Sequence, residues 1–301
     1  MKVINLFDSC SGLFTLKEIY NIPEATMANI IRQCLVRDSI YYDLSDDCVN
    51  IFLRETGIHP DTFDISDVKV HCKHVTTVFD NGVSIKRNGL IPLNRLLEEP
   101  SVLRAFLLEN GIEISPREQY ISINGMKHWI PMESRGCDTD EWENVGLLSA
   151  ILYHDHGEVE AFIAGDQKEI IGYSTVKNNP EILHSVETVV KRLTRKDLGL
   201  EAKWQKKQPQ TNVAEFDAKV LDLSYCNTFK CRHDYPSTYD ELEEFFEKPK
   251  NDNENIWINE WIISSCLYNS CPGYDWSPIA VGIRSNVAIP GDSITLTTVE
   301  R

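Results

Sequence analysis

Basic residues are scarce in this sequence. Its 301 residues include 30 Lys and Arg against 46 Asp and Glu, which gives a formal net charge of -16 at pH 7. The long-range field of such a surface repels phosphate backbones. The charge therefore disfavours a protein that coats nucleic acid without sequence preference, although a local basic cleft is compatible with a nucleic-acid substrate.

Long apolar runs are also missing. No stretch approaches the 18 or more consecutive apolar residues of a transmembrane helix, and the first ten residues do not resemble a secretory signal. Nine cysteines are an odd number and too few for a small domain held together by disulfides. We therefore expect a cytoplasmic protein with mostly free thiols and no membrane partner.

Several well-known catalytic motifs are absent. The sequence has no P-loop, no Gly-x-Gly-x-x-Gly after a predicted strand and no Gly-x-Ser-x-Gly elbow. Their absence disfavours P-loop NTPases, kinases, Rossmann dehydrogenases and typical α/β-hydrolases.

Hydrophobic periodicity predicts an α+β protein in two parts, residues 1–65 and residues 66–301. In the first part, a helix starting at Pro23 carries apolar residues at spacings of three and four, and Gly57 closes the segment. In the second part, residues 68–77 alternate as in a strand, and a short helix follows that Gly89 ends. The other expected helices are 92–110, 181–193 and 240–246, the loops are 203–210 and 248–255, and the strands are 121–123, 159–164, 170–176, 216–223, 256–264, 279–283 and 293–299.

Three short segments stand out within residues 66–301. The first, residues 74–90, begins with His74 and Thr76 and ends in Gly89-Leu90. The second, residues 171–182, contains Tyr173, Ser174 and Thr175. The third carries Glu260 and is followed by Ile289-Pro-Gly-Asp-Ser-Ile294. Together they resemble the ADP-ribosyltransferase superfamily, and the first segment is similar to the opening of DarT-type bacterial toxins.

The resemblance implies a split β-sheet core over residues 66–301 and NAD as a substrate. It implies that His74, Thr76, Tyr173, Ser174 and Thr175 hold NAD, and that Glu260 is the essential carboxylate. The arginine segment of DarT-type enzymes has only Arg117 as a candidate counterpart. A toxin or defence effector would also have a macromolecular acceptor, with protein favoured over nucleic acid by the charge, and an antitoxin or regulatory partner.

The residue types suit this chemistry. Cleavage of the nicotinamide–ribose bond develops an oxocarbenium-like cation, which a fixed carboxylate stabilises. On the expected strand 256–264, Glu260 shares a face with Ile256, Ile258 and Ile262, where an unused carboxylate is costly. His74 shares a face with Val70 and Cys72 in the same way.

Plainer interpretations stand beside these. His74 and Tyr173 are each typical of ordinary core residues when taken alone, and Glu260 is compatible with a strand edge and an ion pair. The sequence also has two cysteine pairs, Cys226/Cys231 and Cys266/Cys271, each with four intervening residues. This spacing is at the loose limit for a structural zinc site, so buried free thiols are the favoured interpretation and no metal is expected. The alternative function is a non-catalytic protein-binding module on a degenerate transferase fold.

Overall fold

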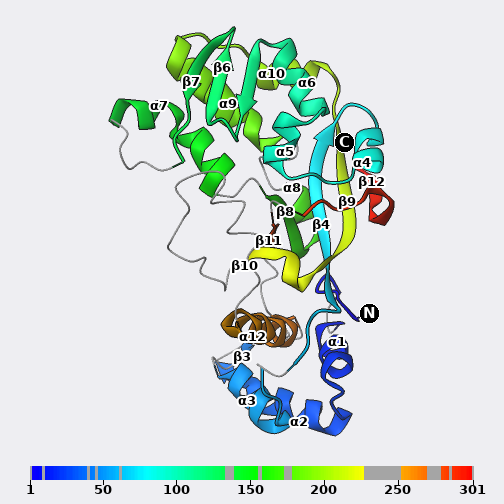
Figure 1. Ribbon diagram of the computed structural model, residues 1–301. Coiled ribbons are helices and arrows are strands. Elements are labelled where there is room, and N and C mark those ends of the chain that lie inside the picture. Colours follow the sequence, from blue (N-terminus) through cyan, green and yellow to red (C-terminus); the bar gives the residue numbers. More distant parts are fainter. Residues whose placement is uncertain are drawn as a thin grey trace.

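The computed structural model describes residues 2–8, 11–38, 41–44, 47–60, 63–132, 139–154, 158–172, 178–226, 252–269, 279–284 and 287–299. Within these ranges the protein is α+β. A largely antiparallel sheet forms the middle of the molecule, a helical unit lies at one end of it, and a mixed unit of helices and a small sheet lies at the other (Figure 1). No helix in these ranges is both long enough and apolar enough to cross a membrane.

The central sheet has the strand order β10-β11-β8-β4-β9-β12, and β1 pairs in parallel with the start of β4. The long strand β4 is central because alternate residues at its start, Val68, Val70 and Cys72, are buried in the main core. The strands of this sheet are β1 (Lys2–Ile4), β4 (Val68–Val78), β8 (Val159–Ala164), β9 (Gln210–Lys219), β10 (Leu223–Cys226), β11 (Ile279–Ile283) and β12 (Thr295–Thr298).

The two neighbours of β4 are paired with it very differently. On one side, β4 pairs with β9 continuously from Lys69↔Lys219 to Val78↔Gln210. On the other side, the only pair between β4 and β8 in the described residues is Lys73↔Phe162. The sheet is therefore split beyond Lys73, where β8 leaves β4 while it stays paired with β11.

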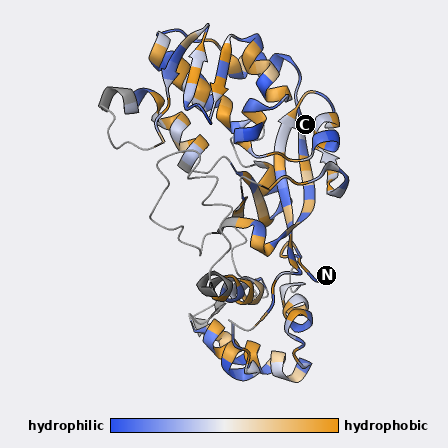
Figure 2. Ribbon diagram, viewed as in Figure 1, coloured by the Kyte–Doolittle hydropathy of each residue, from blue (hydrophilic) through white to orange (hydrophobic). Residues whose placement is uncertain are grey.

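The helical unit consists of the first part of the chain and one late helix. Helix α12 packs against α1 and α3, and its residues share the main core with the first 65 residues and with the sheet. Figure 2 shows hydrophobic residues both on α12 and on the helices below it. The elements of this unit are α1 (Ser11–Tyr20), α2 (Glu24–Cys34), β2 (Leu35–Asp38), β3 (Tyr41–Leu44), α3 (Cys48–Thr56) and α12 (Asp252–Tyr268).

The mixed unit has its own core, which includes Phe106, Leu183 and Trp204. A three-stranded antiparallel sheet, β5-β6-β7, lies among its helices. The elements of this unit are α5 (Leu93–Glu98), α6 (Val102–Glu109), β5 (Ile112–Ser115), β6 (Tyr120–Ile123), β7 (Met126–Trp129), α7 (Thr139–Ser149), the π-helix η1 (Ala150–His154), α9 (Glu181–Thr194) and α10 (Leu200–Lys206). The remaining elements, α4 (Val83–Asn88), α8 (Gln167–Gly172), η2 (Val220–Asp222) and η3 (Gly291–Ser293), flank the central sheet.

Several expected elements are confirmed. Strand β4 and helix α4 lie where the sequence predicts them, and Gly89 ends α4 with a φ of 80°. The helix that begins after Pro23 is α2, and Gly57 caps α3 in the left-handed region. The strands predicted over 121–123, 159–164, 279–283 and 293–299 correspond to β6, β8, β11 and β12, and the helix predicted over 181–193 is α9.

Other predictions are wrong. Residues 256–264 are part of helix α12, which has buried residues on several sides, so that a strand-like run of isoleucines belongs to a helix. Residues 170–172 end helix α8, while 173–176 lie outside the described residues. The loop expected over 203–210 contains most of α10. The single helix expected over 92–110 is divided into α5 and α6. The expected strand 216–223 is interrupted by η2. The helix predicted over 240–246 lies outside the described residues, as do residues 248–251 of the predicted loop. The rest of that loop, residues 252–255, belongs to helix α12.

The first sequence segment and the stretch that follows the third one meet beside α4. Leu90 and Ile289 form an isolated bridge, with N–H to O distances of 2.9 and 3.0 Å in the two directions. A Cβ on Gly89 would lie 2.0 Å from the Ile289 carbonyl oxygen, and a Cβ on Gly291 would lie 2.1 Å from the Lys86 carbonyl oxygen. Both glycines are therefore required by close backbone contact.

We predict that Gly89→Ala destabilises the protein far more than Gly57→Ala. Both glycines have positive φ, which costs an alanine about 1–2 kcal/mol, but a Cβ on Gly57 meets no atom within 4 Å. The clash with Ile289 adds about 2 kcal/mol or more to the loss at Gly89. Urea unfolding of both variants measures the difference, and equal losses would show that the contact with Ile289 is not a constraint.

Candidate functional site

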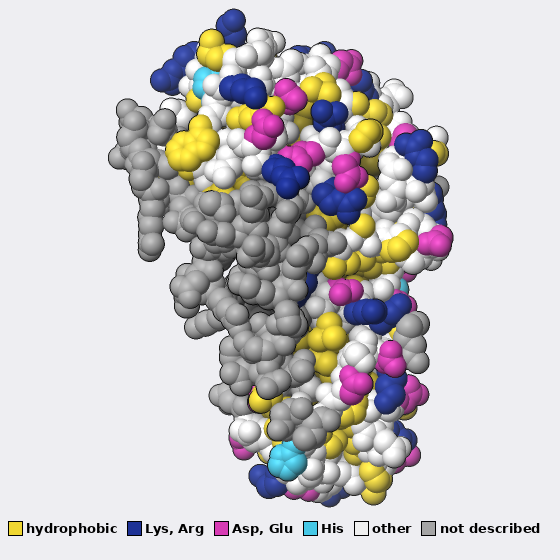
Figure 3. Space-filling model, viewed as in Figure 1, with side chains coloured by type: hydrophobic (Ala, Val, Ile, Leu, Met, Phe, Trp, Pro, Cys, Tyr) yellow, Lys and Arg dark blue, Asp and Glu magenta, His cyan; other side chains and the backbone are white. Residues whose placement is uncertain are grey.

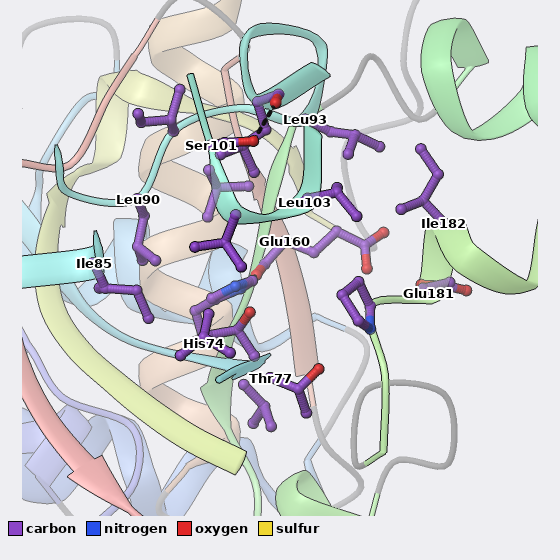
Figure 4. Close-up of a pocket in the computed structure, with 18 of the residues that line it drawn as sticks. His74, Thr77, Ile85, Leu90, Leu93, Ser101, Leu103, Glu160, Glu181 and Ile182 are labelled. Carbon is purple, nitrogen blue, oxygen red and sulfur yellow. Dashed lines mark hydrogen bonds between the residues drawn. The ribbon is translucent and has the colours of Figure 1, made fainter. Parts of the chain in front are cut away.

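A cavity of about 370 Å³ opens where β4 and β8 separate. Its walls come from the last residues of β4, the start of β8, α4, the segment from Gly89 to Leu103, the start of α9 and Trp204 of α10. In Figure 4, Ile85 and Leu90 lie on one side of the cavity, and Ile182 and Glu181 lie on the other. Most of the wall is apolar, with a few polar groups, as is usual for a small-molecule site.

His74 bridges the split in the sheet. Its Nδ1 lies 2.6 Å from the backbone oxygen of Glu160 on β8. Because a carbonyl oxygen can only accept, Nδ1 carries the proton and donates it, and in the neutral ring Nε2 keeps its lone pair. Burial lowers the pKa of His74 below its ordinary value, and the hydrogen bond to Glu160 opposes this shift only in part. His74 is thus a neutral imidazole at pH 7, with Nε2 available as an acceptor or base.

Three glutamates, Glu158, Glu160 and Glu181, also line the cavity, whereas no Lys or Arg does so among the described residues. The Glu160 side chain extends from β8 toward the start of α9 (Figure 4). His74 and Glu160 both line the cavity, so they supply an imidazole and a carboxylate to it, although the hydrogen bond between them joins the imidazole to the backbone of Glu160. The negative wall favours a neutral or cationic ligand group and opposes an anionic one.

The three sequence segments contribute unequally to this cavity. His74, Thr76, Gly89 and Leu90 of the first segment line it, and residues 179–182 of the second do so as well. Ile289, which follows the third segment, supports the wall through its bridge to Leu90. Tyr173, Ser174 and Thr175 lie outside the described residues.

The remaining candidates from the sequence lie elsewhere. Arg117 is exposed in the turn between β5 and β6, where its backbone N–H donates to Glu98 Oε1 at 3.0 Å, and it does not line the cavity. Glu260 is half-buried on α12, between the buried residues Asn259 and Trp261.

The expected meeting of Glu260 with His74 is wrong. None of the residues that line the cavity belongs to α12, and Figure 1 shows this helix in the helical unit on the far side of the central sheet from α5 and α6. The strand face that was to carry Glu260 beside three isoleucines does not exist, because residues 252–268 are helical. A carboxylate that does line the cavity with His74 is that of Glu160, whose backbone oxygen accepts the His74 hydrogen bond and whose side chain extends toward α9.

Sequence reasoning missed Glu160, Thr77 and Trp204. A signal for Glu160 was present, since a charged residue between Val159 and Ala161 interrupts an apolar strand. Trp204 lies in a segment whose polar composition predicts a loop, whereas the structure forms helix α10 there. Thr77 had no signal, because an alternating strand does not reveal where its neighbouring strand departs.

The zinc alternative gains no support from the described residues, in which no group of three or more potential ligands is found. Cys266 is buried on α12 and forms no disulfide, and burial raises the pKa of its thiol, which disfavours the thiolate that zinc needs. Cys231 and Cys271 lie outside the described residues.

The sequence matches no protein-family model, no curated protein and no solved structure.

We predict that His74 titrates below 6.5, its ordinary pKa. As the pH falls through about 6.5, the unfolded chain binds a proton that the folded protein does not, so the free energy of unfolding falls. His74→Gln removes this part of the pH dependence. Urea unfolding between about pH 7.5 and 5.5 compares the two proteins, and the same fall in both would contradict a lowered pKa of His74.

Proposed function

We propose that the chain is an ADP-ribosyltransferase that cleaves NAD in the cavity between β4 and β8 and transfers ADP-ribose to a macromolecule. The observation that carries the proposal is the pair formed by neutral His74 and Glu160 in one cavity. The split sheet agrees with the core that the sequence resemblance implies. NAD hydrolysis is the same reaction with water as the acceptor.

The proposed reaction breaks the bond between the ribose C1′ and the nicotinamide nitrogen. The bonding electron pair leaves with the ring, which becomes neutral, while positive charge develops on the ribose. In this scheme the Glu160 carboxylate stabilises the cation and accepts the proton of the attacking nucleophile. His74 positions the ribose by accepting a hydrogen bond through Nε2 from one of its hydroxyl groups.

The size and charge of the cavity suit one half of the dinucleotide. A volume of about 370 Å³ is near the lower end of the range for ligand pockets, roughly 300–1,000 Å³. The nicotinamide ring of NAD is cationic and its ribose is rich in hydroxyl groups, both of which fit a wall with three glutamates. The anionic diphosphate then lies outside this wall.

A protein acceptor fits the surface better than a nucleic acid does. The chain carries a net charge of -16, and acidic and basic side chains are intermingled on the face in Figure 3. A toxin or defence effector with an antitoxin or regulatory partner remains part of the proposal through the sequence resemblance.

A non-catalytic binding module is the second candidate. The observation that favours it is the position of Glu260, which the resemblance assigns to catalysis and which lies on α12 away from the cavity. The module binds a ligand in the same cavity and releases no nicotinamide.

We predict that Glu160→Gln lowers nicotinamide release from NAD about 100-fold, the usual effect of removing one group that stabilises developing charge. The substitution keeps the backbone oxygen that receives the His74 hydrogen bond, so the cavity wall persists. The matched control is Glu260→Gln, which changes the rate less than about twofold because Glu260 lies outside the cavity. Quantifying nicotinamide by chromatography, with a panel of protein and nucleic-acid acceptors, measures both variants.

Thermal unfolding of the same preparations shows whether each variant is folded. A large loss of activity in folded Glu260→Gln together with an unchanged Glu160→Gln would contradict the assignment. No nicotinamide release by the parent protein with any acceptor would favour the binding module.

A further inference from the structure

Two polar groups in the cavity wall have no hydrogen-bond partner among the described residues. They are the hydroxyl oxygen of Thr77 and the indole N–H of Trp204. Each residue is 1% exposed, and both line the cavity. Trp204 is held by edge-on contacts with Phe79 and Phe106, at ring-centroid distances of 4.8 and 5.0 Å. Its orientation is therefore fixed by packing rather than by a bond from its N–H.

Buried polar groups without partners are rare, because each loses its hydrogen bonds to water on folding and gains nothing in return. The neighbouring strand offers a direct comparison. Thr211 on β9 lies opposite Thr77 in the register and is also buried, at 3% exposure, but it is not among the described buried side chains without a hydrogen-bond partner, and it does not line the cavity. The unpartnered threonine is the one that faces a space large enough for a ligand.

The two groups have one hydrogen-bonding role in common, which is donation. The indole N–H can only donate, and the threonine hydroxyl can donate as well. A ligand that satisfies both groups must present an acceptor to this part of the wall. Because Glu158, Glu160 and Glu181 line the same cavity and no described Lys or Arg does, a charged carboxylate on the ligand is repelled, whereas a neutral oxygen is not.

We infer that Thr77 and Trp204 determine specificity by donating hydrogen bonds to an uncharged carbonyl oxygen of the ligand. The cavity therefore accepts a carboxamide-bearing ring and rejects the corresponding carboxylic acid. The choice of nicotinamide as the ring rests on the proposed function, while the preference for an amide over an acid rests on the two donors and the three glutamates.

The test compares nicotinamide with nicotinate, which differ in the charge and hydrogen-bonding capacity of one group. Isothermal titration calorimetry of the full chain measures both at about pH 7.5. We expect nicotinamide to bind at least about tenfold more tightly than nicotinate. Equal affinities, or tighter binding of nicotinate, would overturn the inference.

Thr77→Val tests the donor directly, because valine has nearly the shape of threonine without the hydroxyl group. We expect the affinity for nicotinamide to fall about fivefold to tenfold, while the unliganded variant melts at the same temperature as the parent or higher, since it no longer buries an unpartnered hydroxyl. The matched control, Thr211→Val, removes the hydroxyl group of a buried residue that does not line the cavity, so it keeps the parent's affinity. Unchanged affinity in folded Thr77→Val would overturn the assignment.

Trp204→Phe provides a second variant that keeps an aromatic ring and removes the N–H. It also lowers the affinity for nicotinamide more than that for nicotinate, and equal effects on the two probes would indicate a loss of packing alone.

Different results reject the specificity inference and the proposed function. Nicotinamide binding that depends on Thr77, without cleavage of NAD, rejects the transferase and keeps the inference, whereas cleavage that is insensitive to both variants rejects only the inference.

Discussion

The separation of β8 from β4 after a single residue pair is the constraint on which the site depends. Strand β4 pairs continuously with β9, while its pairing with β8 is limited to Lys73 and Phe162 among the described residues. His74 spans the split by donating from Nδ1 to the Glu160 oxygen, and the same bond fixes the tautomer of the imidazole. The separation of β8 from β4 therefore accounts for both the cavity and the neutral state of the His74 imidazole.

The walls of the cavity come from parts of the chain that are far apart in sequence. The two close glycine contacts, of Gly89 with Ile289 and of Gly291 with Lys86, hold the end of α4 against the last segment of the chain. The start of α9 and Trp204 bring the mixed unit to the opposite side. Because the walls belong to two hydrophobic cores, the site lies between two packed units, a common location for small-molecule sites.

Local signals were sufficient to predict one half of this site from the sequence. The alternation of residues 68–77 identifies strand β4 and His74 on it, because a strand is recognised from the two-residue period of its side chains. Gly89 identifies the end of α4, because that end depends on the backbone conformation of a single residue. The carboxylate was not predictable in the same way. Ile256, Ile258 and Ile262 suggested a strand because α12 is buried on several sides, and such a helix has little hydrophobic periodicity. Glu160 became relevant only through the departure of β8 from β4, which is a property of tertiary packing.

Under the proposed function, NAD binds between His74 and residue 160 rather than against α12. A crystal structure of the Glu160→Gln variant soaked with NAD examines this placement, because the variant is expected to bind NAD and to cleave it slowly. We expect electron density for the nicotinamide and its ribose between β4 and β8, with a ribose hydroxyl within hydrogen-bond distance of His74 Nε2. Density for the dinucleotide beside Glu260, with an empty cavity at His74, would instead place the substrate site at α12.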